Sequence, residues 1–137
     1  MRIFLLTCIF AASSALAQPY PSKPLRMLVG FAPGGANDIL ARIVSQKLSE
    51  SLGQPVLVEN RPGNSGLIAA EMLAKSAPDG YTLMLGSTGT QTMAPHLAPN
   101  LAYDGLNAFA PVSLVGTTPS ALVVRSARLP DDAGAGE

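Results

Sequence analysis

The sequence predicts an α/β protein with a mainly parallel sheet built in the order βαβαβ. Three short apolar runs predict the strands, and the two segments between them repeat apolar residues at helical spacing. Glycine- and proline-rich turns separate these segments. Strands that alternate with helices form parallel sheets with right-handed crossovers. The carboxyl ends of the three strands should therefore meet at one edge, where open sheets of this class bind ligands.

Residues 1–17 have the features of a secretory signal peptide. Arg2 precedes an apolar run, residues 3–12, and Ala15-Leu16-Ala17 has the small-residue pattern of a cleavage site. The apolar run is too short to span a bilayer. We therefore expect a periplasmic protein that is not embedded in the membrane. Because Cys8 is the only cysteine, the mature chain would have neither a disulfide nor a thiolate metal site.

The charge pattern excludes several classes of partner and cofactor. Nine Lys and Arg residues balance nine Asp and Glu residues, and there is no basic run, so nucleic acid is a poor candidate. The chain has one histidine, which makes a transition-metal site improbable. We predict no metal and no cofactor.

The first half of the chain predicts a strand, an elbow and a helix. Residues 25–29 form the strand and residues 31–35 the elbow. Residues 37–52 form the helix, because its apolar residues recur at helical spacing, and Gly53 is a good C-terminal stop. The helical apolar residues are Ile39, Leu40, Ile43, Val44, Leu48 and Leu52.

The second half repeats this alternation and then weakens. We predict a strand over residues 56–59, a turn over 60–63, a helix over 65–76 and a strand over 81–85. A loop follows over residues 86–90, then a short helical piece over 92–97 and a loop over 100–110. Residues 111–115 and 121–125 resemble two more strands, and residues 131–137 form a disordered or non-native tail.

Three loops rich in glycine and small polar residues leave the predicted carboxyl edge, over residues 31–38, 60–66 and 86–90. Gly34 and Gly35 allow a ligand to approach the backbone, and the amides at the start of the first helix offer hydrogen-bond donors. The polar side chains of the other two loops add uncharged donors. Together these groups suit a carboxylate, although any one loop alone is more typical of ordinary turn and helix-capping chemistry. The added donors are those of Asn64, Ser65, Ser87, Thr88 and Thr90.

Asp38 and Ser87 each leave an alternative open. Asp38 either caps the first helix or contacts a hydroxyl or amine of the ligand. Ser87 with His96 would be the reactive pair of a small exported α/β hydrolase, although the sequence lacks G-x-S-x-G. The glycines lack the spacing of a dinucleotide site, and no Lys-Ser or Lys-Thr follows them as in a P-loop. We predict no catalytic residues and no enzymatic activity, with the hydrolase as the alternative.

Several phrases, in order along the chain, resemble the tripartite tricarboxylate transporter receptors, also called Bug-type periplasmic solute-binding proteins. These phrases are residues 20–26 (YPSKPLR), 31–35 (FAPGG), 38–42 (DILAR), 52–56 (LGQPV), 58–63 (VENRPG), 77–83 (APDGYTL) and 109–112 (FAPV). The resemblance implies a type II Venus-flytrap fold, of which residues 18–130 would be the N-terminal lobe. It also implies a small carboxylate ligand and, as partners, the membrane permease subunits of the transporter.

The resemblance maps the ligand contacts onto the same three loops. The implied ligand-binding residues are Phe31, Ala32, Pro33, Gly34, Gly35, Asp38, Asn64, Gly66, Ser87, Thr88 and Gly89. The chain departs from the family pattern in two respects. Gly30 stands where the family usually has proline, and the sequence stops where the second lobe should begin. We therefore expect a truncated receptor, with a non-functional remnant as an alternative, and weak carboxylate binding by residues 18–137.

Overall fold

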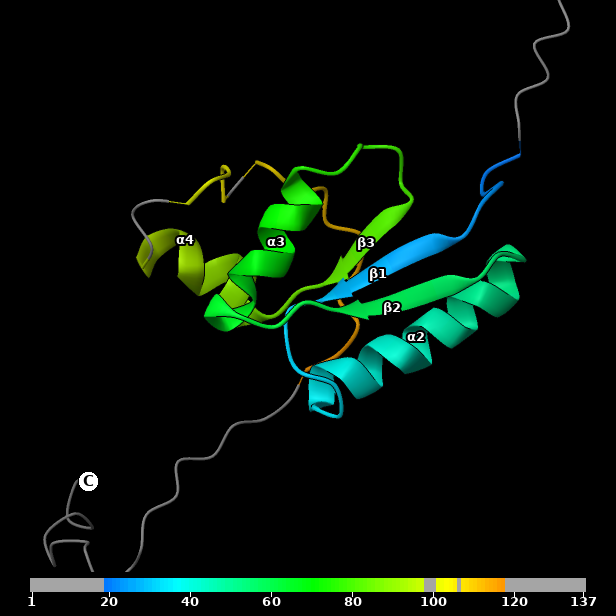
Figure 1. Cartoon of the computed structure of the whole chain (residues 1–137), viewed down its shortest axis with the longest axis horizontal. Helices are drawn as coiled ribbons and strands as arrows, with labels where there is room; N and C mark the ends of the chain where they lie inside the picture. Colours follow the sequence, from blue (N-terminus) through cyan, green and yellow to red (C-terminus); the bar gives the residue numbers. More distant parts are fainter. Residues whose placement is uncertain (1–18, 98–100, 106, 118–137) are drawn as a thin grey trace, which may run out of the picture.

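The computed structural model describes residues 19–97, 101–105 and 107–117. The described part is built on a parallel sheet of three strands in the order β2-β1-β3 (Figure 1). The strands are β1 (Leu25–Val29), β2 (Val56–Asn60) and β3 (Thr82–Leu85). Helix α2 (Ala36–Leu52) joins β1 to β2, and α3 (Leu67–Ala74) joins β2 to β3. The predicted parallel βαβαβ order is confirmed.

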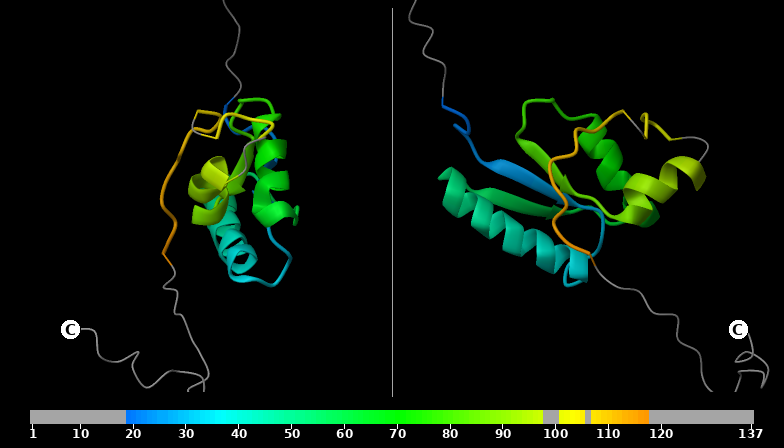
Figure 2. Two further views of the ribbon diagram at one scale, coloured as in Figure 1. Left: turned by 90° about the vertical axis from the view of Figure 1, so that its left-hand side faces the viewer. Right: turned by 180° about the vertical axis from the view of Figure 1, so that it is seen from behind.

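The strand order places the two connecting helices on opposite faces of the sheet. After β1 the chain moves outward to β2, and after β2 it moves back across β1 to β3. Right-handed crossovers in opposite directions put their helices on opposite faces. Figure 2 shows α2 and α3 in two further views. The point between β1 and β3, where the direction reverses, is where open α/β sheets form a ligand crevice.

The core lies between α2 and the facing side of the sheet. Leu25, Met27 and Val29 of β1 are at most 4% exposed and pack with Ala41 of α2 and Val56 of β2. Burial of one Val, Leu or Met side chain stabilises the folded state by about 1.5–3 kcal/mol. Four residues of the predicted apolar stripe of this helix, Leu40, Val44, Leu48 and Leu52, are partly buried around this cluster. The other two, Ile39 and Ile43, are 53% and 55% exposed, so they lie outside the core.

The ends of the helices follow their sequence signals with one departure. Gly53 ends α2 in the left-handed conformation, with φ of 67°, and its N–H donates to the carbonyl oxygen of Ser49. The second helix was expected over residues 65–76. It begins instead with a short 3-10 turn, η2 (Asn64–Gly66), whose residues have positive φ, and the α-helix itself is shorter. The π-helical turn η3 (Gly89–Met93) and α4 (Ala94–Leu97) confirm the expected helical piece.

The strand expected over residues 111–115 is wrong. These residues are irregular, and Val112 and Leu114 are 88% and 80% exposed. Alternating apolar residues form a strand only beside a partner, and within the described ranges no strand pairs with them. The predictions for residues 1–17, 121–125 and 131–137 lie outside the described residues.

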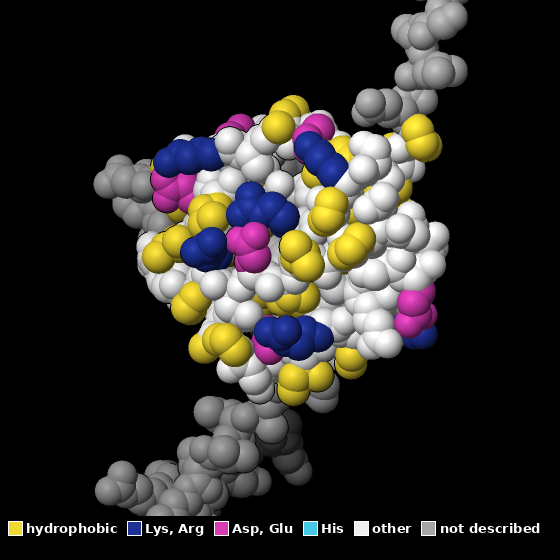
Figure 3. Space-filling model, turned by 45° about the vertical axis from the view of Figure 1, so that its right-hand side comes forward, with side chains coloured by type: hydrophobic (Ala, Val, Ile, Leu, Met, Phe, Trp, Pro, Cys, Tyr) yellow, Lys and Arg dark blue, Asp and Glu magenta, His cyan; other side chains and the backbone are white. Residues whose placement is uncertain are grey.

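The described part of the chain contains no helix that combines the length and apolarity needed to cross a membrane. On the face shown in Figure 3, Lys and Arg side chains adjoin Asp and Glu side chains, and the apolar side chains form small groups between them. The ion pairs include Lys47–Glu50 on α2 and Arg26–Glu59 across β1 and β2.

Candidate ligand-binding site

The three loops predicted to form a site all leave the carboxyl edge of the sheet (Figure 1). The loop after β1 runs into α2, the loop after β2 runs through η2 into α3, and the loop after β3 runs into η3. Thr90 joins the last two, because its Oγ1 donates a 2.9 Å hydrogen bond to the carbonyl oxygen of Ser65. The side chain of Thr90 is fully buried. The sequence correctly predicted that these loops converge.

Two glycines let the first and second loops approach closely. A Cβ placed on Gly30 would lie 2.6 Å from the Cα of Gly66, closer than such atoms approach in proteins. Gly66 itself has φ of +90°, and a Cβ on it would lie 2.6 Å from Thr90 Oγ1 and 3.6 Å from the ring of Phe31. The structure thus brings together Phe31 and Gly66, two of the predicted site residues. It also gives a steric reason, which the sequence did not show, why residue 30 is a glycine.

The turn before α3 has left-handed backbone at successive residues. Asn64 and Ser65 have φ of 46° and 53°, and Gly66 follows in the same region. This conformation is costly for residues with a Cβ and is least costly for asparagine among them. Asn64 is exposed, whereas Gly66 is buried under the loop after β3. The predicted site residue Asn64 is therefore open to solvent at the carboxyl edge.

The loop after β1 exposes the N-terminus of α2. Ala32, Pro33, Gly34 and Gly35 are all exposed, and Gly35 is the N-cap residue with no side-chain cap. The first amides of a helix have no partner within it and carry the positive end of the helix dipole. These four predicted residues thus surround an accessible set of N–H donors.

Asp38 faces into this loop, and its carboxylate is 3% exposed. It accepts hydrogen bonds from Arg42 Nε at 3.0 Å, from the Gly34 N–H at 2.9 Å and from Asn60 Nδ2 at 2.9 Å. The bond from Arg42, with those from Gly34 and Asn60, holds the pKa of Asp38 far below its usual range. These contacts favour the capping alternative, in which Asp38 closes the loop around the helix start.

Asn60 was predicted only as a turn residue, but it organises the site. Its Nδ2 donates to the carbonyl oxygen of Phe31 at 3.1 Å and to Asp38, and its Oδ1 accepts from Arg42 at 3.4 Å. It thereby ties the end of β2 to the loop after β1. The available signal was its position at the carboxyl end of a predicted strand beside two other polar loops.

The residues of the loop after β3 differ in their exposure to solvent. Ser87 is half-buried, and its Oγ lies 3.1 Å from Thr90 Oγ1 and accepts from the Thr90 N–H at 3.3 Å. Thr88 and Gly89 are exposed. The prediction that Thr90 points toward a ligand does not fit its inward hydrogen bond to Ser65. Ser87 forms no hydrogen bond with His96 in the described structure, and His96 is exposed on α4, so these contacts do not support the hydrolase alternative.

No group of three or more His, Cys, Asp or Glu side chains that could hold a metal ion occurs in the described ranges. The donors at this edge include backbone amides, hydroxyls and the side-chain amides of Asn60 and Asn64, while the guanidinium of Arg42 is paired with Asp38. Such uncharged donors suit an anion with several acceptor oxygens.

Residues 40–132 match the family described as "Tripartite tricarboxylate transporter family receptor". The chain belongs to this family. Protein BugT of Bordetella pertussis is 42% identical over 128 residues, a match that covers 89% of this chain and 39% of BugT. The chain spans about two fifths of the length of the curated relatives that it matches.

The family relationship extends to solved structures. MatC of Rhodopseudomonas palustris, solved with bound malate, is 41% identical with a TM-score of 0.67, and the match covers 70% of this chain and 33% of MatC. The periplasmic binding protein BugD is 38% identical with a TM-score of 0.63, and the match covers 67% of this chain and 30% of BugD. The fold is therefore that of a periplasmic binding protein, and the relatives are solute-binding receptors.

Proposed function

We propose that this chain contributes one wall of a periplasmic receptor site for a small carboxylate, with Phe31, Ala32, Pro33, Gly34, Gly35, Asp38, Asn64, Gly66, Ser87, Thr88 and Gly89 at or beside the ligand. The observation that carries the proposal is that two exposed loops with hydrogen-bond donors leave the carboxyl ends of the neighbouring strands β1 and β3, on either side of the reversal in strand order. These loops are residues 32–35 and 88–89.

The chemistry of these loops fits a carboxylate better than a cation or an apolar solute. The N-terminus of α2 supplies amide donors and a favourable dipole, while Thr88 adds a hydroxyl. Asp38 acts as a positioning residue in this scheme, because its carboxylate holds Gly34 in place. The malate bound to MatC is a ligand of the same chemical class.

The proposal extends to export and to partners. Residues 1–17 would direct the chain to the periplasm, and the loaded receptor would deliver its ligand to membrane permease subunits of a tripartite transporter. Closure of two lobes on a ligand is a common capture motion in such receptors. Because one lobe buries less of a ligand than a closed cleft does, binding by this chain should be weak.

A titration of the isotope-labelled chain with L-malate, followed by amide NMR shifts, tests the site. We expect saturable shifts at millimolar ligand for the amides of Gly34, Gly35, Thr88 and Gly89. The uncharged diamide of malate is the matched control and should leave these amides unshifted. Ser87→Ala should reduce the affinity, while Ser51→Ala, at an exposed serine in the last turn of α2, should not.

Two results would contradict the proposal. Shifts confined to other regions would move the site elsewhere, and equal shifts with the diamide would show that the carboxylate is not recognised. Grafting residues 19–117 onto the remainder of MatC would then show whether a second lobe restores malate binding.

A further inference from the structure

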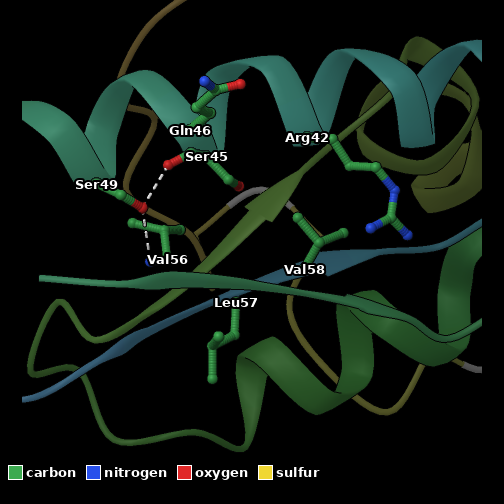
Figure 4. Close-up of a pocket in the computed structure, with 7 residues that line it drawn as sticks. All are labelled: Arg42, Ser45, Gln46, Ser49, Val56, Leu57 and Val58. Atoms are coloured by element: carbon green, nitrogen blue, oxygen red, sulfur yellow. Dashed lines mark hydrogen bonds between the residues drawn. The ribbon is translucent and has the colours of Figure 1, made fainter.

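A groove lies between α2 and β2 (Figure 4). Its volume is about 450 Å³. One wall is a polar stripe of α2 at helical spacing, and the other is three consecutive residues of β2. The stripe consists of Arg42, Ser45, Gln46 and Ser49, and the strand residues are Val56, Leu57 and Val58.

Strand β2 directs toward this groove backbone N–H and C=O groups that do not bond to β1. The N–H of Leu25 donates to Pro55 O, and that of Arg61 donates to Val29 O, so the odd-numbered residues of this segment face β1. The N–H and C=O of Val58 therefore point the other way. In the described part of the chain, β1 is the only strand that pairs with β2. An edge strand with open backbone groups is a template for another extended segment.

Two serines one turn apart on α2 differ in their partners. Ser49 Oγ donates to Ser45 O at 2.7 Å and accepts from the Val56 N–H at 2.8 Å, which caps that part of the edge. Ser45 is 3% exposed, and its Oγ has no hydrogen-bond partner in the described structure. Figure 4 shows Ser45 on the side of α2 that faces β2. Buried hydroxyl groups normally have a partner, so this one is available to a bound molecule.

The surroundings of the edge favour an acidic occupant. On the α2 side, the side chain of Arg42 is 55% exposed and pairs with Asp38. On the other face, Arg26 and Arg61 both pair with Glu59. Three guanidinium groups thus share two carboxylates. The excess positive charge is distributed over both faces of β2, where alternate side chains of an added strand would lie.

We propose that the groove binds an extended, acidic peptide segment of another protein, which adds to β2 as a further strand. Backbone hydrogen bonds to Val58 provide the attachment, as in other cases of strand addition. Side chains on one face of the added strand reach Ser45 and Arg42, and those on the other face reach Arg26 and Arg61. The groove adjoins the proposed carboxylate site at Arg42, which lines the groove and donates to Asp38 and Asn60.

Fluorescence anisotropy with labelled peptides tests the proposal on the full chain. The probe is a heptapeptide of alternating threonine and glutamate, and the matched control replaces glutamate with lysine. We expect saturable binding of the acidic peptide alone. Val58→Pro removes the outward N–H without removing a bond to β1, a substitution that edge strands tolerate. It should raise Kd about tenfold, the effect of about 1.4 kcal/mol.

Ser45→Ala should raise Kd about threefold because it removes the hydroxyl available to the peptide, and Ser113→Ala should leave Kd unchanged. If Val58→Pro unfolds the chain, a second measurement on the unaltered chain takes its place. The acidic peptide is then added to that chain, and the amide shifts of Val58 and Asn60 are expected to change. Equal binding of the lysine peptide, an unchanged Kd in both groove variants, or shifts confined to other residues would overturn the proposal. Concentration-dependent dimers that Val58→Pro abolishes would also overturn it, because a second copy would then occupy the edge.

Discussion

The hydroxyl of Thr90 donates a 2.9 Å hydrogen bond to the carbonyl oxygen of Ser65, 25 positions earlier in the chain. This bond connects the loop after β3 to the turn before α3, and Thr90 is 1% exposed. Ser87 Oγ lies 3.1 Å from the same hydroxyl. The short helical turns η2 and η3, which follow β2 and β3, are thus fixed relative to each other at the carboxyl edge of the sheet, where the ligand is proposed to bind.

Replacing Thr90 by valine should destabilise the fold and loosen both loops. Valine has nearly the same shape but cannot donate to Ser65 O, so this part-buried hydrogen bond is lost at a cost of about 0.5–1.5 kcal/mol. Urea unfolding followed by circular dichroism measures this loss. Thr90→Ser keeps the hydroxyl and should lose less stability than the valine variant. An unchanged stability in Thr90→Val would show that the hydrogen bond does not contribute, and a larger loss in Thr90→Ser would show that the methyl group contributes more.

Gly30→Ala should force the first two loops apart. The added Cβ would lie 2.6 Å from the Cα of Gly66, and a backbone atom cannot move aside as a flexible side chain can. Overpacking of this kind costs about 1–3 kcal/mol. Thermal unfolding measures the loss, and amide shifts of Gly66 report the displacement. Gly116→Ala is the control, because no atom lies within 4 Å of a Cβ placed there. A wild-type melting temperature in Gly30→Ala would contradict the close approach.

The sequence was sufficient for the parts of the fold that depend on local pattern. Apolar spacing and Gly53 predicted α2, and the alternation of strands and helices predicted the parallel sheet. The strand expected over residues 111–115 failed because pairing depends on a partner segment, which periodicity alone does not reveal.

The candidate site was predictable to the level of its loops but not of its contacts. The three loops could be placed at one edge because parallel strands end together. The inward bond of Thr90 and the bridging role of Asn60 depend on distances between loops far apart in sequence. For the same reason Asp38 could not be assigned to capping until Arg42, Gly34 and Asn60 were seen around it.

Stability should fall in acid because Asp38 and Glu59 have lowered pKa values in the folded chain. Hydrogen bonds lower the pKa of Asp38 far below its usual range, and Arg26, followed by Arg61, lowers the pKa of Glu59 to about 2. Unfolded carboxyl groups titrate near pH 4. Each group therefore stabilises the fold fully above that pH, and the contribution is lost as pH falls toward the folded pKa.

Urea unfolding at about pH 5 and about pH 3 measures this dependence, since the unfolded chain binds more protons across that interval. Asp38→Asn should be less stable than wild type at the higher pH and should lose less stability between the two. Glu50→Gln is the matched control at an exposed carboxylate on the same helix. A loss in Asp38→Asn as steep as in wild type would show that Asp38 does not carry the effect.

Ser45→Ala and Ser49→Ala should change stability in opposite directions, although the two serines lie one turn apart on α2. Ser45 buries a hydroxyl that has no partner in the described structure, so its removal should stabilise the fold by about 1 kcal/mol. Ser49 bonds both to Ser45 O and to the Val56 N–H, so its removal should cost about 1–3 kcal/mol. Both substitutions have the same helix propensity change, and each thus controls for the other in thermal unfolding. If Ser45→Ala is as destabilising as Ser49→Ala, then the Ser45 hydroxyl has a partner in solution, and the groove beside β2 loses the open polar group that marks it as a binding site.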